Sequence, residues 1–202
     1  AGAVIALMLT TGTALERYAE GRATRELSAL LAYFASLEIG ACAARAVNNF
    51  FAGLLHDLPE VLTRDIVHPV KQSVGGLDNL IKEYEKRQME KEVYSLIPAE
   101  WHAEMRMFTE SEYRNIVTLD GLVETVASED IEARYNRDEY SPRDGELIKA
   151  TDELAAFVEA YLGIENGIKS DELQQSKNFL KRKFKQATVA GVRFGDIFAD
   201  FE

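Results

Sequence analysis

A histidine and two acids stand close together in the chain at His56, Asp57 and Glu60, and Asp65 adds a third carboxylate shortly afterwards. Imidazole and carboxylate groups are ligands that divalent metals take in proteins. The flanking sequence is apolar, and grouped carboxylates are costly there unless a cation neutralises them. A metal at such a group lowers the pKa of a bound water and polarises the oxygens of a phosphate ester. The pattern therefore predicts a metal site.

The element that must position this group is the helix before it. Apolar residues recur at three- and four-residue steps there, which indicates a helix with a wide buried face: Val47, Phe50, Phe51, Leu54 and Leu55. Pro59 cannot continue that helix, because it lacks an amide donor and disfavours helical geometry at the residue before it. We expect the helix to end near Asp57 or Leu58 and to present the His-Asp pair at a rigid end.

A capping role for Asp57 is the alternative. Asp57 would cap a short second helix that has Pro59 in its first turn and Glu60 three residues further on, as in a capping box. Capping does not exclude metal binding, so both interpretations stay open at this point.

The stretch HDLPEVLTRDIVHPVK, residues 56–71, resembles the signature of the HD superfamily of metal-dependent phosphohydrolases. It is most similar to the branch of bacterial 5′-deoxynucleotidases, in which the HD pair, E, LT, D and PVK follow at the same spacing. The resemblance extends from about Tyr33 to the C-terminus. It implies an all-α, single-domain helical bundle of the HD-domain type. It also implies a hydrolase that acts on a deoxynucleoside 5′-monophosphate with one divalent transition metal, such as manganese or cobalt.

The resemblance also assigns roles to residues. His56 and Asp57 match the paired metal ligands, and the distant third ligand matches Asp152 in GELIKATDELAAFVEAYL. Glu60 matches a residue that orients the attacking water, and Asp65 matches one that lines the sugar site. Without the resemblance, Asp152 would be interpreted as an exposed helix acid.

Other groups near the signature are expected to bind the substrate. Thr63, Arg64 and Lys71 belong to the matching segment. Arg45, which lies earlier in the chain, is a further positive group, and only geometry decides whether it steadies a phosphate.

One ligand of the family pattern is missing. The first ligand histidine would fall within Gly21–Thr24, but no histidine precedes His56. A divalent ion needs several protein ligands, so its loss is expected to weaken metal affinity. This motivates a second hypothesis, a catalytically inactive HD-fold protein that binds a ligand or oligomerises.

His68 and His102 are expected to be surface or core histidines rather than ligands of a second metal.

The first thirty residues have a different character. Residues 1–31 resemble a segment of heavy-metal-transporting P-type ATPases, although no DKTGT motif or Cys-Pro path follows. We therefore expect a foreign N-terminal helical segment, 1–31, joined to an HD-like domain, 32–202. The apolar run at the start is shorter than a membrane helix needs, and it lacks the features of a signal peptide.

The amino-acid composition of the chain limits the kinds of molecule that it can bind. The chain has 202 residues, 47% of them hydrophobic, which suffices for a proper core. Its net charge of −11 argues against binding to nucleic acid or to an anionic membrane. Cys42 is the only cysteine, which fits a reducing cytoplasm, and we expect it to be a core residue. The expected partner is a nucleotide or another small phosphomonoester, and homo-oligomerisation stays open.

The rest of the chain predicts helices and few or no strands, because no stretch shows sustained alternation. Breaks are expected at Gly40 and at Asp120-Gly121, and a helix is expected to start near Ser170. In that last helix, apolar side chains are expected to point inward at Phe179, Leu180 and Phe184. Residues 191–201 are expected to dock on the bundle or on a partner subunit.

Overall fold

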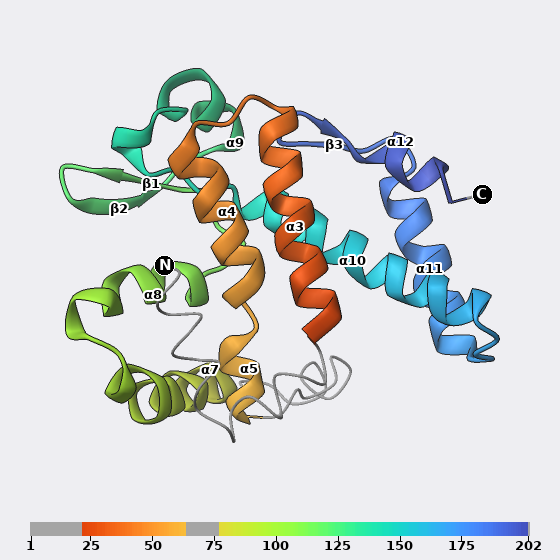
Figure 1. Ribbon diagram of the computed structural model, residues 1–202, viewed down its shortest axis with the longest axis horizontal. Coiled ribbons are helices and arrows are strands. Elements are labelled where there is room, and N and C mark those ends of the chain that lie inside the picture. Colours follow the sequence, from red (N-terminus) through yellow and green to blue (C-terminus); the bar gives the residue numbers. More distant parts are fainter. Residues whose placement is uncertain (1–21, 64–76, 202) are drawn as a thin grey trace. The chain divides into compact units, whose positions relative to one another are not determined.

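The computed structural model describes residues 22–63 and 77–201, and helices dominate them (Figure 1). Contacts divide the chain into two compact units. The first holds the described residues of Ala1–Arg22 and Leu55–Glu110, and the second holds those of Ala23–Leu54 and Ser111–Glu202. The expected all-α class is confirmed. The expected boundary between residues 31 and 32 falls inside a continuous helix and stays a prediction.

The second unit begins with a helical hairpin, α3 (Arg22–Glu38) and α4 (Ala43–Leu55). The break falls at Gly40 as predicted, where φ is +69°, a conformation that glycine adopts without strain. Small residues let the two helices approach closely: a Cβ on Gly53 would lie 3.0 Å from the Cα of Ala29. Tyr33 and Phe50 then pack edge to face with ring centroids 6.2 Å apart.

A distant loop caps the start of α4. The backbone N–H of Cys42 donates to Asn136 Oδ1 at 2.8 Å, and that of Ala44 donates to Asp138 Oδ1 at 2.9 Å. Asn136 Nδ2 also donates to the carbonyl of Gly40 at 3.1 Å. The first amides of a helix have no partner within it, so the loop satisfies groups that α4 leaves open.

The middle of the second unit contains a hairpin, β1 (Ile116–Leu119) and β2 (Leu122–Thr125), in antiparallel register. Asp120 and Gly121 form its turn with φ of +49° and +79°, as the dipeptide predicts. The strands themselves were not located from the sequence. The short elements α9 (Ser128–Asp130), η4 (Ile131–Tyr135) and η5 (Asp138–Tyr140) follow.

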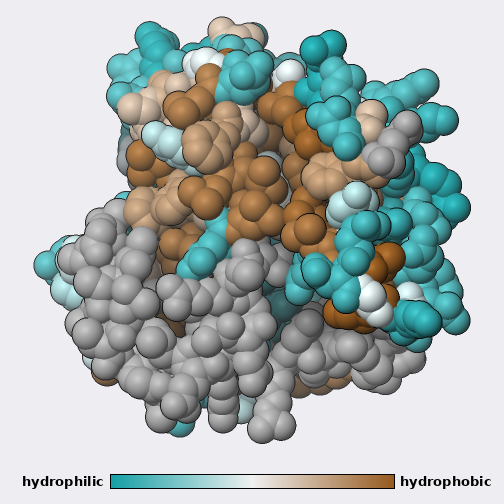
Figure 2. Space-filling view, turned by 45° about the vertical axis from the view of Figure 1, so that its right-hand side comes forward, coloured by the Kyte–Doolittle hydropathy of each residue, from teal (hydrophilic) through white to brown (hydrophobic). Residues whose placement is uncertain are grey.

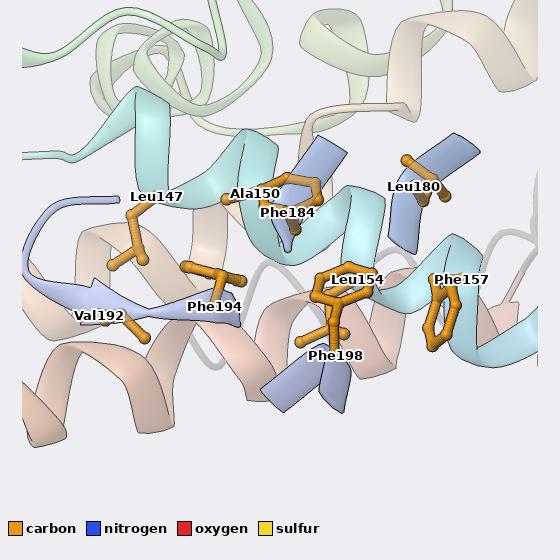
Figure 3. Close-up of a cluster of buried hydrophobic side chains, with 9 residues drawn as sticks. All are labelled: Leu147, Ala150, Leu154, Phe157, Leu180, Phe184, Val192, Phe194 and Phe198. Carbon is orange, nitrogen blue, oxygen red and sulfur yellow. The ribbon is translucent and has the colours of Figure 1, made fainter. Parts of the chain in front are cut away.

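The long helix α10 (Gly145–Glu165) carries the core of the second unit. It packs against α11 (Asp171–Phe184), the small hairpin β3 (Thr188–Val189) and β4 (Val192–Arg193), and α12 (Phe194–Ala199). Figure 3 shows the buried cluster that these elements share, with Phe198 of α12 stacked on Phe184 at 4.9 Å between centroids. The C-terminal residues therefore dock on the bundle, one of the two placements expected for them.

The predicted start of α11 is confirmed, because the Ser170 hydroxyl accepts the backbone N–H of Leu173 at 3.2 Å. The prediction for its apolar face is right for Leu180 and Phe184 and wrong for Phe179. Phe179 is 58% exposed. It directly precedes the buried Leu180, and adjacent positions on a helix point about 100° apart, so only one of them can face α10.

The first unit contains α5 (Leu58–Thr63), α7 (Leu77–Gln88), η1 (Met89–Val93), η2 (Tyr94–Leu96), η3 (Ala99–Trp101) and α8 (His102–Thr109). Its buried Tyr94 packs against His102 with ring centroids 5.1 Å apart and ring planes tilted by 41°, and the Arg106 guanidinium lies 4.6 Å from the Tyr94 ring centroid. His102 is thus part of the packing, as expected.

Large apolar side chains also reach the surface. Figure 2 shows apolar residues gathered on one face of the molecule. On α3 and α4, the exposed members are Leu30, Phe34, Leu37 and Val47. Among the helices described, none is long and apolar enough to cross a membrane.

Candidate metal centre

His56 and Asp57 occupy the turn between α4 and α5. Helix α4 ends at Leu55, slightly earlier than predicted, and α5 begins at Leu58. Pro59 accounts for the restart, because it is tolerated in the first turn of a helix and not in its interior. The carbonyl of Asp57 accepts the backbone N–H of Glu60 at 3.1 Å, which makes Asp57 the residue that opens α5.

The pair has the geometry of two ligands to one ion. His56 Nε2 and Asp57 Oδ1 lie 3.2 Å apart. Nitrogen and oxygen ligands bind a transition metal at about 2.0–2.2 Å, so two of them at roughly right angles lie about 3 Å apart. The His56 side chain is only 1% exposed and that of Asp57 is 32% exposed. A buried imidazole beside a half-exposed carboxylate therefore fits a metal that solvent and substrate reach from one side.

The neighbouring residues of the signature are described only in part. Glu60 is half-buried in the first turn of α5, on the same helix end as Asp57. Thr63 is the last residue of α5. Three further residues with expected roles lie outside the described residues, so those roles stay predictions: Arg64, Asp65 and Lys71. His68 lies outside them too.

Asp152, the expected third ligand, belongs to α10 in the second unit. It is half-buried, and its Oδ2 accepts a hydrogen bond from the Tyr113 hydroxyl at 3.4 Å. The Lys149 ammonium, one turn earlier on α10, lies 5.7 Å from the centroid of the Tyr113 ring. Asp152 is thus not the exposed helix acid that its position alone would suggest.

The geometry decides against Arg45 as a phosphate ligand, a role that the sequence left open. It is 1% exposed and forms a bidentate pair with Asp144, with 2.7 Å from Nε to Oδ2 and 3.1 Å from Nη2 to Oδ1. Its Nη1 donates to Glu132 Oε2 at 2.7 Å. Each of its three guanidinium nitrogens therefore donates to a carboxylate of the second unit.

Cys42 is half-buried rather than a full core residue. Burial raises the pKa of its thiol, which lowers the thiolate fraction at neutral pH. Burial therefore makes Cys42 a poor nucleophile at neutral pH.

Among the described residues, no group of three or more His, Cys, Asp or Glu side chains forms a metal site. His56 and Asp57 are the part of the expected ligand set that lies within one unit. The third expected ligand belongs to the other unit.

A family model described as HD domain matches residues 27–180, which is most of the chain. The protein belongs to the HD domain family. Members of this family are generally hydrolases that bind a divalent metal. No curated protein and no solved structure matches the chain. The matched range includes His56 and Asp57, whose Nε2 and Oδ1 atoms lie 3.2 Å apart.

Sequence reasoning missed two long-range contacts of α10 in this HD protein, those of Tyr113 with Asp152 and of Asn115 with Glu146. Tyr113 precedes Asp152 by 39 positions, and nothing in the spacing links the two. Asn115 exchanges two hydrogen bonds with Glu146: Nδ2 donates to Oε1 at 3.0 Å, and the Glu146 N–H donates to Asn115 Oδ1 at 3.1 Å.

Proposed function

We propose that this HD-family protein is a metal-dependent phosphomonoester hydrolase whose substrate is a deoxynucleoside 5′-monophosphate. The observation that carries the proposal is the HD pair itself, whose imidazole nitrogen and carboxylate oxygen are spaced as two ligands of one ion. The match of the HD signature to the deoxynucleotidase branch supports the narrower substrate class.

In this proposal, the metal ligands are His56, Asp57 and Asp152. A bound manganese or cobalt ion would acidify a water and polarise the phosphoryl oxygens. His56 binds as the neutral imidazole, and the two aspartates supply the negative charge that offsets the cation. The turn between two helices fixes His56 and Asp57 before any ligand arrives, because both are anchored by the end of α4 and the start of α5.

The remaining signature residues act on water and substrate. Glu60, in the first turn of α5, orients the attacking water and takes a proton from it. Asp65 contacts the sugar. Thr63, Arg64 and Lys71 bind the phosphate, the two cations by pairing with its oxygens.

A second candidate is an inactive HD-fold protein that binds a nucleotide or assembles with copies of itself. The absence of a histidine before His56 favours it, since the family pattern has an earlier ligand. The apolar side chains exposed on α3 and α4 are available for assembly. We propose a cytoplasmic setting for both candidates, with no nucleic acid or membrane partner.

Phosphate release from a panel of nucleotides separates these candidates. The purified chain would be incubated with cobalt or manganese and with deoxynucleoside 5′-monophosphates, their 3′ isomers and ribonucleotides. Asp57→Asn and Asp152→Asn remove proposed ligands, and Glu165→Gln removes an exposed carboxylate at the end of α10 as the control.

We expect metal-dependent release from the 5′-deoxynucleotides, a loss of at least a hundredfold in both aspartate variants and none in Glu165→Gln. Undiminished turnover in either aspartate variant would refute the ligand assignment. Absence of hydrolysis with every metal, together with a nucleotide-induced rise in Tm, would favour the inactive binding protein.

A further inference from the structure

We propose that an apolar face of the α3–α4 hairpin binds the same face of a second copy of the chain. This hairpin face comprises six side chains that are exposed or half-buried: Leu30, Tyr33, Phe34, Leu37, Val47 and Phe50. It lies wholly within the second unit. The inference is independent of catalysis, since it applies equally to a hydrolase and to an inactive HD-fold protein.

The hairpin face is continuous across the two helices. Ring contacts run from Phe34 to Tyr33 on α3, with centroids 5.9 Å apart, and from Tyr33 to Phe50 on α4, with centroids 6.2 Å apart. Leu30, Phe34 and Leu37 follow one another at four- and three-residue steps, so they share one side of α3. Apolar side chains that are gathered in this way mark an interaction site, whereas single exposed ones need no explanation.

The charges beside the hairpin face argue against an anionic partner. Among the side chains of α3 that the structure describes, the exposed charged ones are Glu26 and Glu38, both acidic. Helix α4 adds no exposed charge, because its single charged residue, Arg45, is buried. Helices that lie on anionic lipid carry Lys and Arg beside their apolar side, and nucleic acid requires the same charges. The hairpin face therefore fits an apolar protein surface.

The apolar area of the hairpin face suits a dimer. Its four most exposed side chains range from 45% exposed for Val47 to 60% for Phe34. Side chains of this size offer on the order of 150–200 Å² each when fully exposed, so these four expose roughly 300–400 Å². A two-fold contact buries the same patch on both copies, roughly 600–800 Å² of apolar surface in all. Since about 35–45% of an interface is polar, the total reaches about 1,000–1,400 Å², which suffices for a small specific interface.

The two helices that carry the hairpin face are fixed to each other from inside. Asn49 Nδ2 on α4 donates to the Ser36 hydroxyl oxygen on α3 at 2.9 Å, and that hydroxyl donates to the carbonyl of Ala32 at 2.7 Å. Asn49, Ser36 and Ala32 are buried. A face that is formed in advance loses little conformational entropy when a partner binds.

Phe34→Glu tests the proposal, because it places a charge in the middle of the apolar side of α3. Val47→Glu makes the same kind of change on α4, so the test does not depend on the folding of one variant. Phe179→Glu is the matched control, since Phe179 is 58% exposed on α11 and lies outside the hairpin face. The full chain and each variant would be studied by sedimentation velocity from about 1 to 200 µM, in about 50 and about 500 mM NaCl. Circular dichroism would measure their helix content.

We expect wild type and Phe179→Glu to pass from monomer to dimer within this concentration range. Phe34→Glu and Val47→Glu should each raise the dissociation constant at least tenfold and keep the helix content of wild type. Higher salt should strengthen the wild-type dimer, because it screens the repulsion between two chains of charge −11.

A wild-type chain that is monomeric at the highest concentration would overturn the inference and leave the hairpin face to a partner of another kind. A dimer that both Phe34→Glu and Val47→Glu retain would overturn it too. So would a dimer that higher salt dissociates, since ion pairs rather than apolar contacts would then hold the two copies together.

Discussion

Arg45 and Asp144 are 99 residues apart in the chain and form a bidentate ion pair in which both side chains are almost fully buried. Arg45 belongs to α4 and Asp144 immediately precedes α10. Asn49, one turn after Arg45, adds a hydrogen bond to Asp144 Oδ2 at 2.8 Å and accepts the Asp144 N–H at 2.8 Å. The pair therefore sets the register between the helix that leads into His56 and the helix that carries Asp152.

The two carboxylates that Arg45 contacts should differ in their effect on stability. Asp144→Asn leaves a buried guanidinium without its main counter-charge and should lower the free energy of unfolding by about 3–5 kcal/mol. Glu132→Gln should cost under about 1 kcal/mol, because the Glu132 side chain is 58% exposed. Urea unfolding of both variants measures the difference. Equal losses would show that the network is not organised around Asp144.

Two glycines of α10 should respond oppositely to alanine. Gly163→Ala adds a methyl group that meets only side-chain carbons at 3.5 and 3.7 Å, and removing glycine from a helix interior should stabilise the protein by about 0.5–1 kcal/mol. Gly145→Ala drives a Cβ into the backbone of Tyr113 and Arg114 and should destabilise it by about 1–3 kcal/mol or more. Thermal melts of the two variants test this, and a stable Gly145→Ala variant would contradict the close approach of the two segments.

Asp138 should make stability depend on acid pH. The Ala44 N–H that it accepts lowers the pKa of its carboxyl below the ordinary value. The unfolded chain therefore binds the proton first as pH falls. The stabilisation is complete above the ordinary pKa of about 3.9 and is lost as pH falls through the lower folded-state value. Asp138→Asn keeps an acceptor oxygen without the charge, so wild type should be the more stable at pH 6, and the difference between the two should shrink as pH falls below about 4.

Melting curves at pH 6 and pH 3 measure how far this difference shrinks. Glu139→Gln is the control, because Glu139 pairs with Arg137 at the surface and caps no helix. A difference between wild type and Asp138→Asn that stays constant across this range would mean that the charge of Asp138 has no part in capping α4.

Local signals in the sequence predicted local structure well. Gly40, Ser170 and the Asp120-Gly121 turn are each found where the pattern places them, because a left-handed glycine, a serine cap and a tight turn depend on a few adjacent residues. The turn at His56-Asp57 followed from Pro59 in the same way. The short distance between His56 Nε2 and Asp57 Oδ1 needed no long-range information, since the two residues are consecutive in the chain.

Long-range partners were not predictable from one sequence. The sequence showed that Arg45 lies near the signature and left a phosphate-binding role open, but it did not show the ion pair with Asp144. The hairpin of β1 and β2 escaped prediction because each strand is only four residues long, too short for alternation to show. The hydrogen bond from Tyr113 to Asp152 was missed because the two residues are far apart in the chain and no local pattern links them, as for Arg45 and Asp144.

The number of metal ions per chain tests the central claim most directly. Protein loaded with cobalt or manganese and freed of excess would be analysed for metal content, beside Asp57→Asn, Asp152→Asn and the control Glu165→Gln. The account predicts one ion per chain in wild type and in Glu165→Gln, and a large loss in both aspartate variants. Metal-free wild type, or one ion retained in Asp152→Asn, would contradict it.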